Sequence, residues 1–279
     1  MANDITDNIY FPLCCLNYDK DIKKTAGLLI GYGITEFAKK LEKKIELEDH
    51  DIDNIENYIN DNNLGYVNED DYHIILSAKK LRIDIGSISN IKSNHSVINN
   101  FIINFERKHG TDCKVKVHKS LLFEVRDGQF DERMFRVYCA ILSIIGNKKF
   151  VRITNSRINY RMLGFKSVEV YYKEKPKYKP LTARQIKTTT DKLSERNFFS
   201  KITYRNRLTF YSTAYRGKEF SDVLTSSIAF NKEKKEVNRI LNDNLNIGVE
   251  KKRKEIREKL VAGLSPKEIK CEMELIRAG

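Results

Sequence analysis

The side chains with the clearest capacity for chemistry lie between positions 148 and 207 and carry cationic, amide or hydroxyl groups. Such groups hydrogen-bond to phosphate oxygens and to the edges of bases. In the stretch TARQIKTTTDKLSERN, residues 182–197, they occupy helix positions that cannot all be buried, and two arginines then mark the tip of a predicted hairpin. The candidate contacts with nucleic acid are Lys148, Arg157, Arg184, Gln185, Lys187, Thr188, Lys192, Lys201, Arg205 and Arg207.

Catalytic chemistry has much weaker support in the sequence. The chain has no His-x-His motif, as a relaxase of the two-histidine type would need, and no Gly-x-x-x-x-Gly-Lys-Ser/Thr phosphate loop. The acidic triplet at residues 69–71 is typical of a helix N-terminus, where carboxylates interact favourably with the helix dipole. Cys14 and Cys15 lie in an apolar stretch and are expected to be buried. We therefore predict a protein that is not an enzyme and that needs no metal or cofactor.

Charge is divided unevenly along the chain. The formal net charge is +13, but residues 1–130 carry 17 Lys and Arg against 21 Asp and Glu, a net of −4. Residues 131–279 carry 34 basic and 17 acidic residues, a net of +17. A single charged run is usually a solvated helix face, whereas a basic half of this size is typical of a surface that binds polyphosphate. The second half is therefore the predicted binding surface.

Length and composition indicate a folded protein of one large or two modest domains. Of the 279 residues, 41% are hydrophobic and 32% are charged, and no long uncharged apolar run indicates a membrane span. The five cysteines have no CxxC spacing, so neither a disulfide framework nor a zinc site is indicated. The start, MANDITDNIYFPL, shows no secretory pattern. We expect a cytoplasmic protein with no membrane partner.

Residues 1–130 form the acidic first region, for which hydrophobic spacing predicts an α+β structure. Apolar residues recur at helical intervals in three stretches, and a fourth, acidic stretch is predicted as a helix or a linker. The three helical stretches are residues 20–48, 69–82 and 96–109, and the acidic stretch is residues 49–66. Alternating apolar and polar residues over 113–125 (CKVKVHKSLLFEV) predict a strand, with His118 on its surface or hydrogen-bonded. Gly31 and Gly33 follow no strand, so a packing or kink role is expected of them rather than phosphate binding.

Residues 131–215 form the basic second region, in which helices alternate with short strands. In order, the predicted elements are a helix from Asp131 to Ile145, a strand over 148–153, a helix from Thr154, a connector over 166–180, a helix from Thr182 and a hairpin with arms FFSKITY and LTFYST. The helix from Thr182 is expected to bury Ile186 and Leu193 and to expose its cationic residues.

This order resembles the winged helix-turn-helix of DNA-binding proteins, and residues 182–213 are similar to their recognition helix and wing. The resemblance implies that the helix from Thr182 enters the major groove while Arg205 and Arg207 hold the phosphate backbone. The connector 166–180 is longer than the usual turn between the two helices, which leaves their relative angle open. Because it is basic and rich in tyrosine, it is predicted either as a further nucleic-acid contact or as a disordered loop.

The sequence thus predicts an α+β, predominantly helical protein in three parts. These parts are an acidic region (1–130) that contacts a partner protein or forms a second winged helix, a basic winged-helix domain (131–215), and a basic helical tail (216–279). The predicted function is non-catalytic binding of duplex DNA by a sequence-specific regulator or a replication initiator of a phage or mobile element. A regulator would bind a palindrome as a homodimer, and an initiator would bind direct repeats. The alternatives are a protein-interaction or virion-associated module whose basic half binds an acidic partner, and RNA binding.

Overall fold

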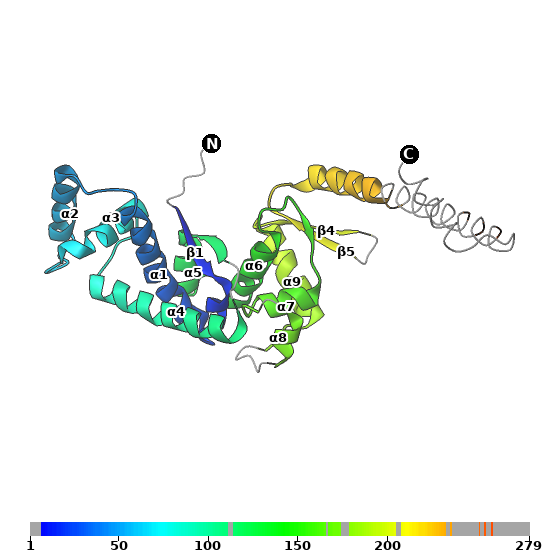
Figure 1. Ribbon diagram of the computed structural model, residues 1–279, viewed down its shortest axis with the longest axis horizontal. Coiled ribbons are helices and arrows are strands. Elements are labelled where there is room, and N and C mark those ends of the chain that lie inside the picture. The colour runs from blue at the N-terminus through cyan, green and yellow to red at the C-terminus, as the bar shows by residue number, and fades with distance from the viewer. Residues whose placement is uncertain are drawn as a thin grey trace. The chain divides into compact units, whose positions relative to one another are not determined.

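The structure is a computed structural model that describes residues 7–110, 114–165, 167–173, 179–204 and 208–232, with the single residues 235, 251, 254 and 258 (Figure 1). The chain divides into two compact units, Met1–Gly217 and Lys218–Gly279. Across the described ranges most residues are helical and the strands form two small antiparallel sheets, which confirms the expected α+β, predominantly helical class. In the second unit residues 218–232 are helical, and most of the predicted tail lies outside the described residues.

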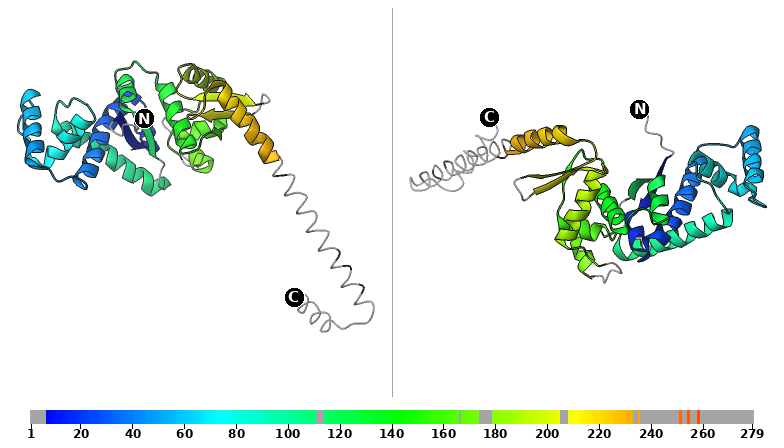
Figure 2. Two further views of the ribbon diagram at one scale, coloured as in Figure 1. Left: turned by 90° about the horizontal axis from the view of Figure 1, so that it is seen from above. Right: turned by 180° about the vertical axis from the view of Figure 1, so that it is seen from behind.

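The N-terminal part of the first unit is built around a central helix, α1. The elements are β1 (Asn8–Pro12), the 3-10 helix η2 (Leu13–Asn17), α1 (Ile22–Glu42), α2 (Asp49–Asp61), the 3-10 helix η3 (Glu69–Asp71), α3 (Tyr72–Lys80), α4 (Ile88–His109), β2 (Lys114–His118) and α5 (Lys119–Arg126). Helix α1 packs against α3, α4, α5 and β1, and the views in Figure 2 show the same neighbours around it. Strands β1 and β2 pair antiparallel, with Tyr10 opposite Lys116.

A glycine in α1 allows strand β1 to approach the helix closely. A Cβ atom added at Gly33 would lie 2.5 Å from Cγ2 of Ile9, which is closer than carbon atoms can pack. At Gly31 an added Cβ would lie 2.8 Å from Cβ of Asn94 in α4. The predicted packing role of these glycines is confirmed.

One predicted strand is wrong over half of its length. Only Lys114–His118 is a strand, and the following residues form α5. The alternation of apolar and polar positions ends at His118, after which Leu121, Leu122 and Val125 follow helical spacing and are buried. The side chain of His118 accepts a hydrogen bond from the backbone N–H of Ser120 at 3.2 Å, so this exposed histidine caps the helix that interrupts the predicted strand.

The remainder of the first unit follows the predicted order of helices and strands. Its elements are α6 (Glu132–Ile145), β3 (Val151–Arg152), α7 (Asn155–Arg161), α8 (Val168–Lys173), α9 (Ala183–Glu195), β4 (Ser200–Tyr204) and β5 (Leu208–Ser212). The side chains of Asp131 and Thr154 cap α6 and α7 as expected, accepting bonds from the backbones of Met134 and Arg157. The sheet has the order β3-β5-β4, so the short strand after α6 joins the hairpin as a third strand.

Helix α6 is buried around most of its circumference. Besides its apolar residues, Arg136 is also buried, with 1% of its surface exposed. Its guanidinium donates hydrogen bonds to the backbone carbonyls of Leu16, Asp19 and Lys20, and to the carboxylate of Glu132. The hydrophobic core runs from β1 to β5. The predicted boundary at residue 130 therefore falls between α5 and α6, within one packed unit.

Candidate nucleic-acid interface

Helix α9 is anchored along one face and open along the other. Ile186, Thr189, Thr190 and Leu193 are buried, which confirms the two apolar positions predicted to face the core. The open face carries exposed basic and hydroxyl side chains at helical spacing. Its exposed members are Arg184, Lys187, Thr188 and Lys192.

The N-terminus of α9 is fixed by a reciprocal capping box. The hydroxyl of Thr182 accepts from the backbone N–H of Gln185 at 3.2 Å, and the side-chain oxygen of Gln185 accepts from the backbone N–H of Thr182 at 2.9 Å. Gln185 was predicted as a base contact, but its carbonyl oxygen is engaged in this cap. Its amide nitrogen remains the only part of the side chain that can meet a base. The Thr-x-x-Gln spacing is itself the sequence signature of this cap.

The long connector before α9 ends at a fixed point. Asn159 of α7 accepts a hydrogen bond from the backbone N–H of Leu181 at 2.8 Å and donates one to the carbonyl of the same residue at 2.9 Å. Within the connector, residues 168–173 form α8, where Tyr171 is buried and Tyr172 is 76% exposed. Because Asn159 holds Leu181, the residue before the Thr182 cap, the start of α9 is tied to α7 despite the length of the connector.

A groove of about 690 Å³ lies between α9, the start of α7 and the hairpin β4–β5. Three of the predicted contacts, Arg184, Lys187 and Lys201, line it together. The remaining lining residues are Asn155, Ala183, Thr190, Thr203, Thr209 and Tyr211. The groove therefore combines cationic side chains with hydroxyl and amide groups, which is the chemistry that recognises a phosphate backbone.

The groove cations differ in their partners. Among the residues that the structure describes, no carboxylate lies within ion-pair distance of Arg184 or Lys187. The ammonium of Lys201 lies 2.6 Å from Oδ1 of Asp191 and 2.8 Å from the hydroxyl of Thr190, and its side chain is only 12% exposed. Lys201 therefore ties β4 to α9, and the two α9 cations are the ones available to an incoming anion.

The other predicted contacts lie outside the groove lining. Lys148 is exposed in the turn between α6 and β3, and Arg157 is half-buried in the first turn of α7. Thr188 and Lys192 are exposed on α9. Arg205 and Arg207, which form the predicted wing tip, lie outside the described residues.

Several groove residues were missed at the level of sequence. Thr203 and Thr209 face each other across the hairpin, a pairing that depends on the register of β4 and β5. Tyr211 is 2% exposed and closes the back of the groove, where burial raises its pKa to about 12. The polar residues of the two hairpin arms indicated that these arms could contribute to a polar surface. Their register, which decides which residues face each other, could not be derived from the sequence.

Comparisons with protein-family models, with curated proteins and with solved structures find no match to this chain. In the part of the chain that the structure describes, no helix is both long enough and apolar enough to cross a membrane. Over the same residues, no three His, Cys, Asp or Glu side chains are grouped as metal ligands would be.

Proposed function

We propose that residues 131–215 bind duplex DNA non-catalytically as a winged helix, in a sequence-specific regulator or a replication initiator of a phage or mobile element. The observation that carries this proposal is the groove between α9 and the hairpin, with Arg184 and Lys187 on its wall. The succession of helix α6, strand β3, helices α7 and α9 with the short α8 between them, and the hairpin β4–β5 supports the same architecture. So does the β3-β5-β4 order, because pairing with β3 holds the hairpin in the sheet next to α9.

The dimensions of α9 suit insertion into the major groove. Its 13 residues make a rod about 20 Å long at 1.5 Å per residue. The major groove, roughly 12 Å wide, admits such a helix.

In this arrangement Arg184, Lys187 and Thr188 face base edges and phosphates, while Lys192 and the hairpin arms follow the backbone. Lys148 and Arg157 would contact neighbouring phosphates. The N-terminal region would provide contacts to a partner protein or to a second copy.

The decisive experiment is selection of bound fragments from a random duplex pool at about 0.15 M salt, where weak electrostatic contacts are screened. We expect enrichment of one motif. A palindrome would indicate a dimeric regulator and direct repeats an initiator. Absence of any enriched motif would overturn the proposal and favour an acidic protein partner or RNA.

Substitutions on α9 test the assignment of the helix. We expect Arg184→Ala or Lys187→Ala to weaken binding to the selected site by 1–3 kcal/mol, roughly 5- to 150-fold. Neither change should shift the unfolding midpoint, because both side chains are exposed. Lys24→Ala, an exposed cation of α1, is the matched control and should leave affinity unchanged. If Arg184→Ala leaves sequence preference intact while Arg205→Ala weakens all sequences equally, the helix assignment is wrong and the wing assignment stands.

A further inference from the structure

A second cavity, of about 330 Å³, lies in the N-terminal part between β1, the C-terminal half of α1 and the start of β2. Its floor is apolar and aromatic, with Ile9 2% exposed and Tyr32 5% exposed. Phe37 and Tyr10 form part of its wall, and Tyr10 is 40% exposed. A flat or apolar body of small-molecule size fits a cavity of this volume and lining.

Three lysines surround the opening of this cavity. Lys40 and Lys44 come from α1 and the residues that follow it, and Lys114 from β2. All three are exposed, and no carboxylate of the described residues lies within ion-pair distance of any of them. The ammonium of Lys40 lies 5.4 Å from the centroid of the Tyr10 ring. This cationic rim stands out in a region whose net charge is −4.

The one carboxylate in the lining, Glu36, already has two partners from outside the cavity. Oε1 of Glu36 lies 3.0 Å from the ammonium of Lys39 and 3.0 Å from Nε2 of His95, neither of which lines the cavity. The negative charge of Glu36 is therefore balanced locally, and the cavity as a whole favours an anion.

We propose that this cavity binds a nucleoside phosphate. The base would lie against Tyr10 and Phe37, since aromatic rings stack on one another. Tyr32, whose ring already stacks on the imidazole of His95, would form the floor beneath it. The phosphates would be held at the rim by Lys40, Lys44 and Lys114, as ammonium groups bind phosphate oxygens in charge-assisted contacts. This site is separate from the groove beside α9 and stands independently of DNA binding.

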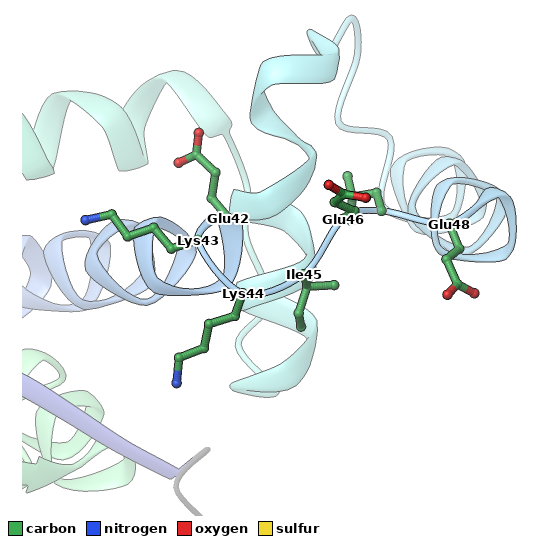
Figure 3. Close-up of a pocket in the computed structure, with 7 residues that line it drawn as sticks. Glu42, Lys43, Lys44, Ile45, Glu46 and Glu48 are labelled. Atoms are coloured by element: carbon green, nitrogen blue, oxygen red, sulfur yellow. The ribbon is translucent and has the colours of Figure 1, made fainter.

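The chain offers a matched pair of lysines for the test. Lys43 and Lys44 are neighbours at the end of α1, and Figure 3 shows their side chains leaving the helix end in different directions. Both line a more open depression along the loop of residues 42–48, but only Lys44 also lines the cavity. Both are exposed, so replacement of either should leave the fold intact.

The experiment is calorimetric titration of the full chain with AMP and ATP at about 0.15 M salt. We expect saturable binding at one site, with adenosine, ribose 5-phosphate and inorganic phosphate each weaker by about tenfold or more. Lys44→Gln and Lys114→Gln should each weaken AMP binding by about tenfold, the loss expected of one charge-assisted contact. Lys43→Gln should leave AMP affinity unchanged.

Three results would overturn the proposal. They are no saturable binding, equal losses for Lys43→Gln and Lys44→Gln, and binding of ribose 5-phosphate as tight as that of AMP. The Lys187→Ala variant separates this site from the DNA-binding proposal. It should retain AMP binding, and loss of AMP binding in that variant would place the nucleotide in the α9 groove and sink the assignment to the β1–α1 cavity.

Discussion

The N-terminal and C-terminal parts of the first unit differ in how their cations are paired. In the N-terminal part several of the lysines and arginines contact a carboxylate. These pairs are Lys39–Glu36, Lys92–Asp71, Lys119–Asp7 and Arg126–Asp127. On α9, no carboxylate among the described residues is within ion-pair distance of Arg184, Lys187 or Lys192. Net charge separates the two regions only coarsely, and the pairing of individual cations distinguishes the open face of α9 from the paired cations of the N-terminal part.

Each region also contains cations that depart from its general pattern of pairing. In the N-terminal part three cations that have no carboxylate partner among the described residues, Lys40, Lys44 and Lys114, line one cavity with an aromatic floor. In the C-terminal part Lys201 is paired and nearly buried, and it connects two elements. A cation without a carboxylate is therefore a candidate contact only where it lines a groove or cavity, since Lys24 and Lys43 line neither the α9 groove nor the β1–α1 cavity and serve as controls.

The largest expected effect concerns Arg136, the buried cation that joins the two regions. Arg136→Met removes the donors for the carbonyls of Leu16, Asp19 and Lys20. Buried acceptors without partners are costly, so we expect a loss of about 3–5 kcal/mol in the free energy of unfolding. Urea denaturation followed by circular dichroism measures it.

The control for this substitution lies in the same helix. Arg133 is exposed, and Arg133→Met should change stability by no more than about 0.5 kcal/mol. Equal losses in the free energy of unfolding for Arg136→Met and Arg133→Met would show that Arg136 does not connect the two regions.

The sequence identified most helices of the C-terminal region because their caps are local signals. Asp131, Thr154 and Thr182 each lie just before an apolar stripe, and each side chain accepts a backbone hydrogen bond in the structure. The burial of Arg136 could not be predicted in this way, because its acceptors are more than a hundred positions away in the sequence. The pairing of Lys201 with Asp191 spans only ten positions, but it depends on the turn between α9 and β4, whose direction the apolar pattern does not specify.

The next effect tests whether Lys201 is structural, unlike its neighbours on the groove wall. Lys201→Met removes its contacts with Asp191 and Thr190 and should lower the free energy of unfolding by about 1–2 kcal/mol. Lys192→Met, at an exposed position of α9, should leave stability unchanged. A tenfold loss of DNA affinity without a loss of stability would instead make Lys201 a direct contact, as the sequence predicted.

A smaller effect is expected at the capping box of α9. Thr182→Ala removes the acceptor for the backbone N–H of Gln185 and should destabilise the protein by about 1 kcal/mol. Thr188→Ala, in the middle of the same helix, should be neutral or slightly stabilising, because alanine favours helices. Asp21→Ala at the start of α1 removes a similar cap. Since α1 is packed on several sides and α9 has an open face, only Thr182→Ala should also weaken DNA binding.

The smallest expected effect concerns Glu36, whose pairing with Lys39 and His95 should make the free energy of unfolding depend on pH. Burial would raise the pKa of Glu36, but hydrogen bonds from Lys39 and His95 outweigh it and hold the pKa below its usual value of 4.5. A carboxyl group whose pKa is lowered by folding stabilises the protein above its unfolded pKa, and that stabilisation is lost as the pH falls through the folded pKa.

Glu36→Gln should therefore cost about 1 kcal/mol or less at pH 7, since the side chain is 30% exposed and partly screened. The difference from the unsubstituted protein should shrink as the pH falls below the ordinary glutamate pKa and through the lowered pKa of the folded state, because the glutamate then becomes protonated. Glu42→Gln, an exposed carboxylate in the last turn of α1, should produce no loss, because a negative charge there opposes the helix dipole. Denaturant melts of the three proteins at several pH values measure this. A cost for Glu36→Gln that stays constant down to pH 3 would mean that packing rather than charge pairing holds α1 to α4, and the contrast with α9 would then rest on burial alone.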